Sequence, residues 1–115
     1  MSTQNTPETP ALMDINGFVA NVNAELLKYY EKDYPRLVEL GMVPQVRVEA
    51  GPKYFKIVKF DQSSTSAYCF VERQTGSILK AASWKTPAKG IRGNISDPNF
   101  GWGRAVGVYG AAYRR

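Results

Sequence analysis

The chain has 115 residues, with 15 basic and 10 acidic side chains, no histidine and one cysteine. This length allows one domain, and a hydrophobic content of 43% is sufficient for a buried core. The absence of histidine excludes a Ser-His-Asp or Cys-His nucleophile, and one cysteine cannot form a zinc site or an intramolecular disulfide. The composition therefore favours a binding protein over a metalloenzyme.

The charge is distributed unevenly along the chain. Residues 1–50 carry four basic and seven acidic side chains, a net charge of −3, whereas residues 51–115 carry eleven basic and three acidic ones, a net charge of +8. Such an asymmetry is typical of proteins that bind a polyanion. We therefore expect the binding residues in the second half of the chain.

The polar N-terminal segment, residues 1–12, is predicted to be a disordered tail before a single domain over residues 13–115. It has no apolar signal core, and no apolar run in the sequence approaches the roughly 20 residues that span a bilayer. We therefore expect a cytoplasmic protein with no membrane partner.

The first predicted element is an amphipathic helix over residues 14–34. Apolar side chains at spacings of three and four share one face: Ile15, Phe18, Val19, Val22, Leu26 and Tyr30. Asp14 is the expected N-cap, and Pro35 ends the helix because it lacks an amide hydrogen. Pro35 also suits the first position of a second short helix, which would end at Leu40 before Gly41.

Strand patterns follow within residues 45–80. Valine alternates with polar residues over 45–49, and aromatic and β-branched residues fill 54–60. Further strands are expected over 67–72 and 77–80. Together with the helix, these segments predict an α+β fold in which the N-terminal helix packs on a small antiparallel sheet of three to five strands.

Regular patterning fades after residue 80. Residues 81–97 contain a proline and two glycines and are predicted to form a long basic loop. Residues 98–115 combine four glycines with aromatic side chains. A last strand with turns and a partly mobile tail both fit this segment.

The strand at 54–60 mixes cationic and aromatic side chains. Alternation places Tyr54 and Lys56 on one face, and Lys53 and Lys59 on the other with Phe55. Stacking an unpaired base on an exposed aromatic ring is worth about 1–3 kcal/mol, and nearby lysines would hold the phosphates. An ordinary strand with core aromatics and solvated lysines fits the same pattern.

The predicted loop places four cations around one tryptophan. The cations are Lys80, Lys85, Lys89 and Arg92, and the tryptophan is Trp84. From residue 80 onward the first acidic residue is Asp97. Such a loop can follow a phosphate backbone while the indole ring stacks on a base. The alternative is a solvated loop with the tryptophan folded into the core.

Several stretches of the basic half form a recognisable frame. They are Lys56-Ile57-Val58, Gly76 to Lys80, Ala82 to Lys89, and Arg92 to Ile95. Over residues 53–97 this frame resembles small uncharacterised proteins encoded by bacterial viruses. The resemblance implies a viral origin and a host-cell cytoplasmic setting, and it carries no activity or functional residue over to this chain.

We predict a non-enzymatic protein that binds nucleic acid, single-stranded DNA above all, with low sequence specificity and without metal or cofactor. Single strands are favoured because ten of the fourteen aromatic residues lie in the basic half and no recognition-helix motif is visible. The predicted contact residues are Tyr54, Lys56, Lys59, Phe70, Lys80, Trp84, Lys85, Lys89, Arg92 and Arg104. The sequence leaves DNA and RNA both open.

No catalytic residue is predicted. Cys69 has no histidine to activate it, and Asp61, Glu72 and Asp97 show no acid/base or metal-ligand spacing. The alternative function is a viral protein-interaction module, either an inhibitor of a host enzyme or a minor virion component, whose basic surface meets an acidic protein. Because a short sheet has exposed edges, a homo-oligomer is also compatible with this sequence.

Overall fold

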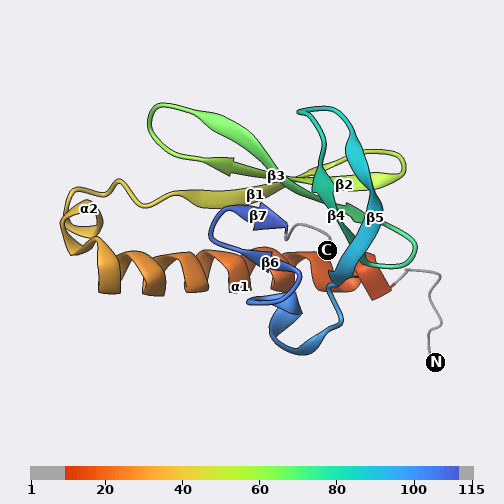
Figure 1. Cartoon of the computed structure of the whole chain (residues 1–115), viewed down its shortest axis with the longest axis horizontal. Coiled ribbons are helices and arrows are strands. Elements are labelled where there is room, and N and C mark those ends of the chain that lie inside the picture. Colours follow the sequence, from red (N-terminus) through yellow and green to blue (C-terminus); the bar gives the residue numbers. More distant parts are fainter. Residues whose placement is uncertain (1–9, 112–115) are drawn as a thin grey trace, which may run out of the picture.

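The computed structural model describes residues 10–111, with side chains described from residue 15 onward. Helix α1 spans Pro10–Asp33 and helix α2 spans Pro35–Glu39. Five strands follow and pair in chain order as one antiparallel sheet. The strands are β1 (Gln45–Ala50), β2 (Tyr54–Phe60), β3 (Thr65–Glu72), β4 (Ser77–Ala81) and β5 (Pro87–Asn94). One long helix along one face of this sheet confirms the predicted α+β fold (Figure 1).

Helix α1 begins earlier than predicted. The tail was expected to reach residue 12 and the N-cap to be Asp14, whereas the helix begins at Pro10 and runs through both positions. Both predictions are wrong because proline suits the first turn, where its missing amide hydrogen has no helical partner, and the next three residues are good helix formers. The predicted disorder of residues 1–9 lies outside the described residues.

The apolar face of α1 packs on one face of the sheet. Phe18, Val22 and Leu26 have no exposed surface, and Ile15 is 3% exposed. The strand residues in the same core include Phe55, Ile57, Cys69 and Val71. We call the sheet face that carries these four strand residues the covered face. Its packing confirms the helix face predicted from the sequence.

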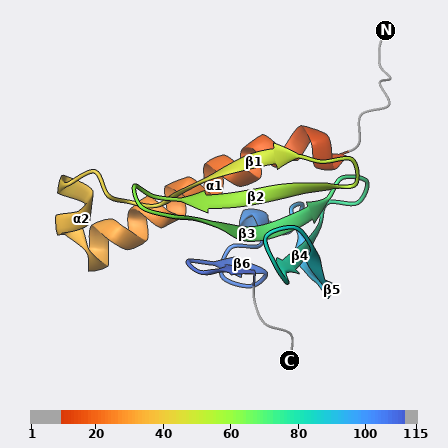
Figure 2. The ribbon, with the colours of Figure 1, turned by 90° about the horizontal axis from the view of Figure 1, so that it is seen from above.

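The C-terminal segment covers the remainder of this face. A 3-10 turn, Pro98–Gly101, leads to a hairpin of β6 (Val106–Gly107) and β7 (Gly110–Ala111). Figure 2, which looks onto the opposite face, shows α1 on the β1 side and β6 on the β3 side. The Tyr68 hydroxyl donates a hydrogen bond to the Gly107 carbonyl oxygen at 2.5 Å. Through residue 111 the segment therefore forms short strands with turns, the first of the two predicted alternatives.

The predicted loop over residues 81–97 is wrong for about half of its length, because residues 87–94 form β5. Its proline and glycines suppress a strand prediction. The β4–β5 register shifts twice, between Ile78 and Leu79 and between Leu79 and Ala81, and Gly90 adopts a φ of 97°. These irregularities accommodate the glycine while the ladder continues. The connection between the two strands is the short turn at residues 82–86, which closes with a hydrogen bond from the Ala82 amide to the Thr86 carbonyl at 2.9 Å.

Side chains bind the backbone of both edge strands. On β1, the Asn23 side-chain amide of α1 accepts from the Val46 amide at 2.7 Å and donates to the Val46 carbonyl at 3.1 Å. On β5, the Arg92 guanidinium donates to the carbonyl of Gly90 at 2.8 Å and to that of Lys89 at 3.3 Å. On β1 the contacts occupy backbone groups that another strand would otherwise pair with. The homo-oligomer stays a prediction.

Candidate nucleic-acid interface

The face of the sheet opposite α1 carries polar and aromatic side chains from strands β1, β2 and β3. Lys56 of β2 lies between Glu49 of β1 and Phe70 of β3, and Tyr54 of β2 pairs with Glu72 of β3. Because directly paired residues project to the same side of a sheet, these side chains share one surface. We call this surface, defined by Glu49, Tyr54, Lys56 and Phe70, the open face.

The turn between β4 and β5 rises over the open face (Figure 1). It places the Nζ atom of Lys56 3.7 Å from the centroid of the Trp84 ring, a cation–π contact. The turn is held by a 2.9 Å hydrogen bond between the hydroxyls of Ser83 and Thr86. The Trp84 side chain remains 41% exposed, so the interpretation of this residue as a core tryptophan does not hold.

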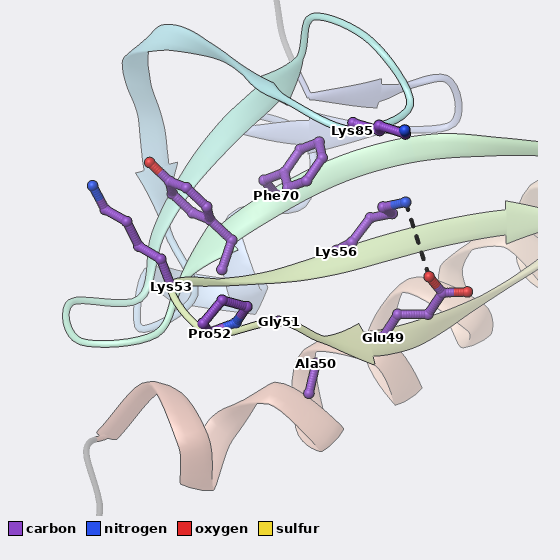
Figure 3. Close-up of a pocket in the computed structure, with 9 residues that line it drawn as sticks. Glu49, Ala50, Gly51, Pro52, Lys53, Lys56, Phe70 and Lys85 are labelled. Carbon is purple, nitrogen blue, oxygen red and sulfur yellow. Dashed lines mark ion pairs between the residues drawn. The ribbon is translucent and has the colours of Figure 1, made fainter.

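A pocket of about 240 Å³ lies on the open face between the β1–β2 turn and the β4–β5 turn. Figure 3 shows Lys53, Lys56 and Lys85 around it, together with the Phe70 side chain of β3. The Tyr54 and Phe70 rings meet edge to face with their centroids 6.0 Å apart. Phe70 is only 3% exposed, so it forms part of the pocket wall and offers no free face for stacking.

The electrostatics of the pocket combine three ammonium groups with one carboxylate. The Glu49 Oε2 atom lies 2.8 Å from the Arg47 guanidinium, and the Oε1 atom lies 3.9 Å from Lys56 Nζ. Lys53 Nζ lies 5.5 Å from the centroid of the Tyr54 ring. With Lys53, Lys56 and Lys85 against Glu49, the charged groups that line the pocket sum to a positive charge. The pocket can therefore attract an anionic ligand and offer it aromatic surface.

Half of the predicted contact residues gather here. Tyr54, Lys56, Phe70, Trp84 and Lys85 lie at the pocket or over it. Two members of the site were not predicted. Glu49 was not considered, and Lys53 was assigned to the opposite face because strict alternation was extended into the β1–β2 turn, where β2 has not yet begun. The pairing of Glu49 with Lys56 across the Gly51-Pro52 turn was the sequence signal that could have found Glu49.

The other five predicted contact residues lie elsewhere. Lys59 is on the covered face, where its Nζ donates to the Val108 carbonyl at 2.9 Å and burial lowers its pKa. Lys80 follows Leu79, the partner of Phe70, and alternation therefore turns it away from the open face. Lys89 and Arg92 belong to the edge strand β5, and Arg104 is exposed in the turn before β6.

The thiol is buried, and the carboxylates of the described residues form no metal-binding cluster. Cys69 is fully buried, and burial raises the pKa of its thiol. A protonated, inaccessible thiol is not a nucleophile. Among the described residues no group of three cysteine, aspartate or glutamate side chains is placed to hold a metal ion.

Residues 2–105 match the model of a family described as "Family of unknown function (DUF7717)". No curated protein and no solved structure matches the chain. Between residues 10 and 111, no helix is long and apolar enough to cross a membrane.

Proposed function

The chain belongs to a family of unknown function, and for this chain we propose that the open face binds single-stranded nucleic acid, DNA above all. The observation that carries the proposal is the placement of the exposed Trp84 ring 3.7 Å above Lys56 Nζ, beside a pocket with two further lysines. An aromatic face and ammonium groups at this spacing suit a base and its neighbouring phosphates.

Single strands suit this surface better than a duplex does. Unpaired bases can stack on aromatic side chains of a sheet, whereas the major groove of a duplex is read by an inserted helix or ribbon. The long helix α1 buries its apolar face under the sheet, on the side away from the open face. Because phosphate contacts and stacking carry little base information, we expect low overall sequence specificity.

A salt titration tests the proposal. The affinity of a fluorescent single-stranded oligonucleotide would be measured at several salt concentrations by anisotropy. Each phosphate neutralised on a single strand contributes about −0.7 to the slope of log affinity against log salt, so three lysines predict a slope of about −2. Absence of binding at about 50 mM salt would contradict the proposal.

A matched pair of aromatic variants locates the site. Trp84→Ala is expected to weaken oligonucleotide binding by about 1–3 kcal/mol, since a stacking platform is lost. Tyr109→Ala removes an aromatic side chain that is 88% exposed but lies in the β6–β7 turn, and it should leave the affinity unchanged. Equal losses of oligonucleotide affinity in the two variants would contradict the assignment of the binding site to the open face.

A protein-interaction module is the second candidate, favoured by the opposite end of the molecule. Four of the seven large hydrophobic side chains that the described residues leave exposed lie there: Leu27, Tyr34, Leu40 and Met42. Tyr34 packs against Tyr29 and Tyr30, with ring centroids 5.9 and 5.5 Å away. Exposed tyrosine and methionine are typical of the centre of a protein interface.

The proposal includes the setting that the resemblance over residues 53–97 implies, a bacterial-virus protein acting in the host cytoplasm. In that setting the second candidate corresponds to an inhibitor of a host enzyme or a minor virion component. Absence of oligonucleotide binding at about 50 mM salt, with a folded protein, would favour this second candidate.

A further inference from the structure

We propose that the pocket on the open face accepts one base of the bound strand and that this base is guanine, held through its Watson–Crick edge by Glu49. The inference rests on the proposed nucleic-acid binding and adds a preference at one position to it. The preference is inferred from the Glu49 carboxylate, which lies in a pocket whose lysines otherwise suit a phosphate.

The size of the pocket limits what it can hold. Its volume of about 240 Å³ is below the roughly 300–1,000 Å³ of pockets that enclose drug-sized ligands. A single base fits such a space, and the sugar and phosphate attached to it stay outside. Lys53 and Lys85, both exposed, lie at the pocket where that backbone would pass (Figure 3).

The Glu49 carboxylate decides between a phosphate and a base as the occupant. The lysines attract phosphate to the rim of the pocket, but a phosphate inside it would also lie beside the like charge of Glu49, which a neutral base avoids. The Oε1 atom of Glu49 lies 3.9 Å from Lys56 Nζ, which is beyond hydrogen-bond distance. The carboxylate therefore retains acceptor capacity that the N–H groups of a base can satisfy, although its Oε2 atom is bound to Arg47.

The pattern of donors on each base selects guanine. The Watson–Crick edge of guanine presents two adjacent N–H donors, which match the two oxygens of a carboxylate. Adenine and cytosine present one amino group beside a ring acceptor, and thymine presents one N–H between two carbonyl oxygens. Because the side chain of Glu49 is only an acceptor, it pairs best with guanine and is repelled by the carbonyls of thymine.

The aromatic wall of the pocket supports a planar ligand of this kind. Tyr54 is half-buried and lines the pocket, and its ring is fixed by the edge-to-face contact with Phe70. Stacking on tyrosine tolerates any base, so it contributes affinity rather than selection. Selection is therefore assigned to the carboxylate alone, and a single substitution can separate the two contributions.

Oligothymidylates of one length, each with a single central dG, dA, dC or inosine, test the preference against the unsubstituted strand. We expect the dG strand to bind about 5- to 100-fold more tightly than the unsubstituted one, the range for one well-formed bidentate base contact. Inosine lacks the amino group of guanine and should lie between the two. Glu49→Gln replaces one acceptor oxygen by a donor and should abolish the dG preference while affinity for oligothymidylate is kept or increased.

The matched control is Glu39→Gln, which removes the same charge from an exposed position on α2 and should keep the dG preference. Thermal unfolding of each variant confirms that the protein remains folded. Equal affinity for all strands, or a dG preference that persists in Glu49→Gln, would overturn this inference while the proposed function stands. Failure of every strand to bind at low salt would overturn both.

Discussion

The two faces of the sheet are built from the same strands but differ in burial and in the polarity of their side chains. On β2, Phe55 and Ile57 are buried against the helix, while Tyr54 and Lys56 contribute to the pocket on the other side. The period-two geometry of a strand makes this division possible within seven residues. One face therefore determines stability, and the other is available for a ligand.

Lys59 shows that charge alone does not assign a residue to the binding surface. It shares the covered face with Phe55 and Ile57, but it lies at the margin of the core, where the Val108 carbonyl accepts its hydrogen bond. This hydrogen bond from its ammonium group connects the C-terminal segment to the sheet. On β2, alternation rather than residue type separates Lys59, which bonds the C-terminal segment, from Lys56, which lines the pocket.

The largest expected effect is on the covered face. Phe18→Ala removes a ring with no exposed surface and should lower the free energy of unfolding by about 3–5 kcal/mol, measured by urea denaturation. Leu27→Ala on the same helix is the control, because that side chain is 41% exposed and its loss should cost no more than about 0.5 kcal/mol. Similar losses for the two variants would contradict the described packing of α1.

A matched pair of glycine variants probes how the C-terminal segment packs on the covered face. A methyl group at Gly93 would collide with the methyl group of Ala105, so Gly93→Ala should destabilise the protein by about 1–3 kcal/mol. At Gly107 a methyl group meets nothing within 4 Å, and Gly107→Ala should be neutral or stabilising by up to about 1 kcal/mol. Thermal unfolding measures both, and a stable Gly93→Ala would mean that the segment is not docked as described.

A smaller loss of stability is expected at the edge of β1, where Asn23 binds the backbone of Val46, and it should be accompanied by self-association. Asn23→Ala removes both hydrogen bonds to Val46 and should cost about 1 kcal/mol of stability. It also frees the edge backbone, so light scattering should detect more self-association. Asn16→Ala, at an exposed position of the same helix, is the control, and an unchanged Asn23→Ala would show that the amide does not protect the edge.

The smallest effect on stability is expected on the open face. Lys85 is exposed in the β4–β5 turn, so Lys85→Ala should change the unfolding free energy by less than about 0.5 kcal/mol. The same variant should weaken oligonucleotide binding at low salt and reduce the magnitude of the salt slope by about 0.7. Lys28→Ala, which removes an exposed lysine from α1, should leave both the affinity and the slope unchanged. An equal loss of affinity in the two variants would contradict the assignment to one face.

Most of the fold was predictable because the helix and the first four strands follow their own periodicities. β5 was missed, since its proline and glycines are tolerated only through register shifts that depend on pairing with β4. The turn at Asn99 and Phe100 is equally hidden from the sequence. Both residues adopt a φ of 56°, rare for residues other than glycine. Two hydrogen bonds to α1 hold this turn: the Asn99 carbonyl accepts from the Asn21 side-chain amide, and the Asn99 side-chain amide donates to the Glu25 carboxylate.

The candidate site was predictable only in part. Tyr54 and Lys56 follow from strand alternation, and Trp84 and Lys85 from their charge context. The β4–β5 turn folds back over Lys56. This position depends on the path of two strands in space, which no local sequence pattern encodes. The sequence does not show that neighbouring side chains bury Phe70, which leaves this predicted contact residue only 3% exposed.

The most direct test of the central claim is an NMR titration of the ¹⁵N-labelled protein with a short single-stranded oligonucleotide. The account predicts that amide shifts change at residues 49–56, 70 and 82–86, on and above the open face. The amide chemical shifts of α1 and of residues 104–111, which pack on the covered face, should not change. Changes confined to residues 27–42, or no changes at a low salt concentration, would contradict the claim that the open face binds nucleic acid.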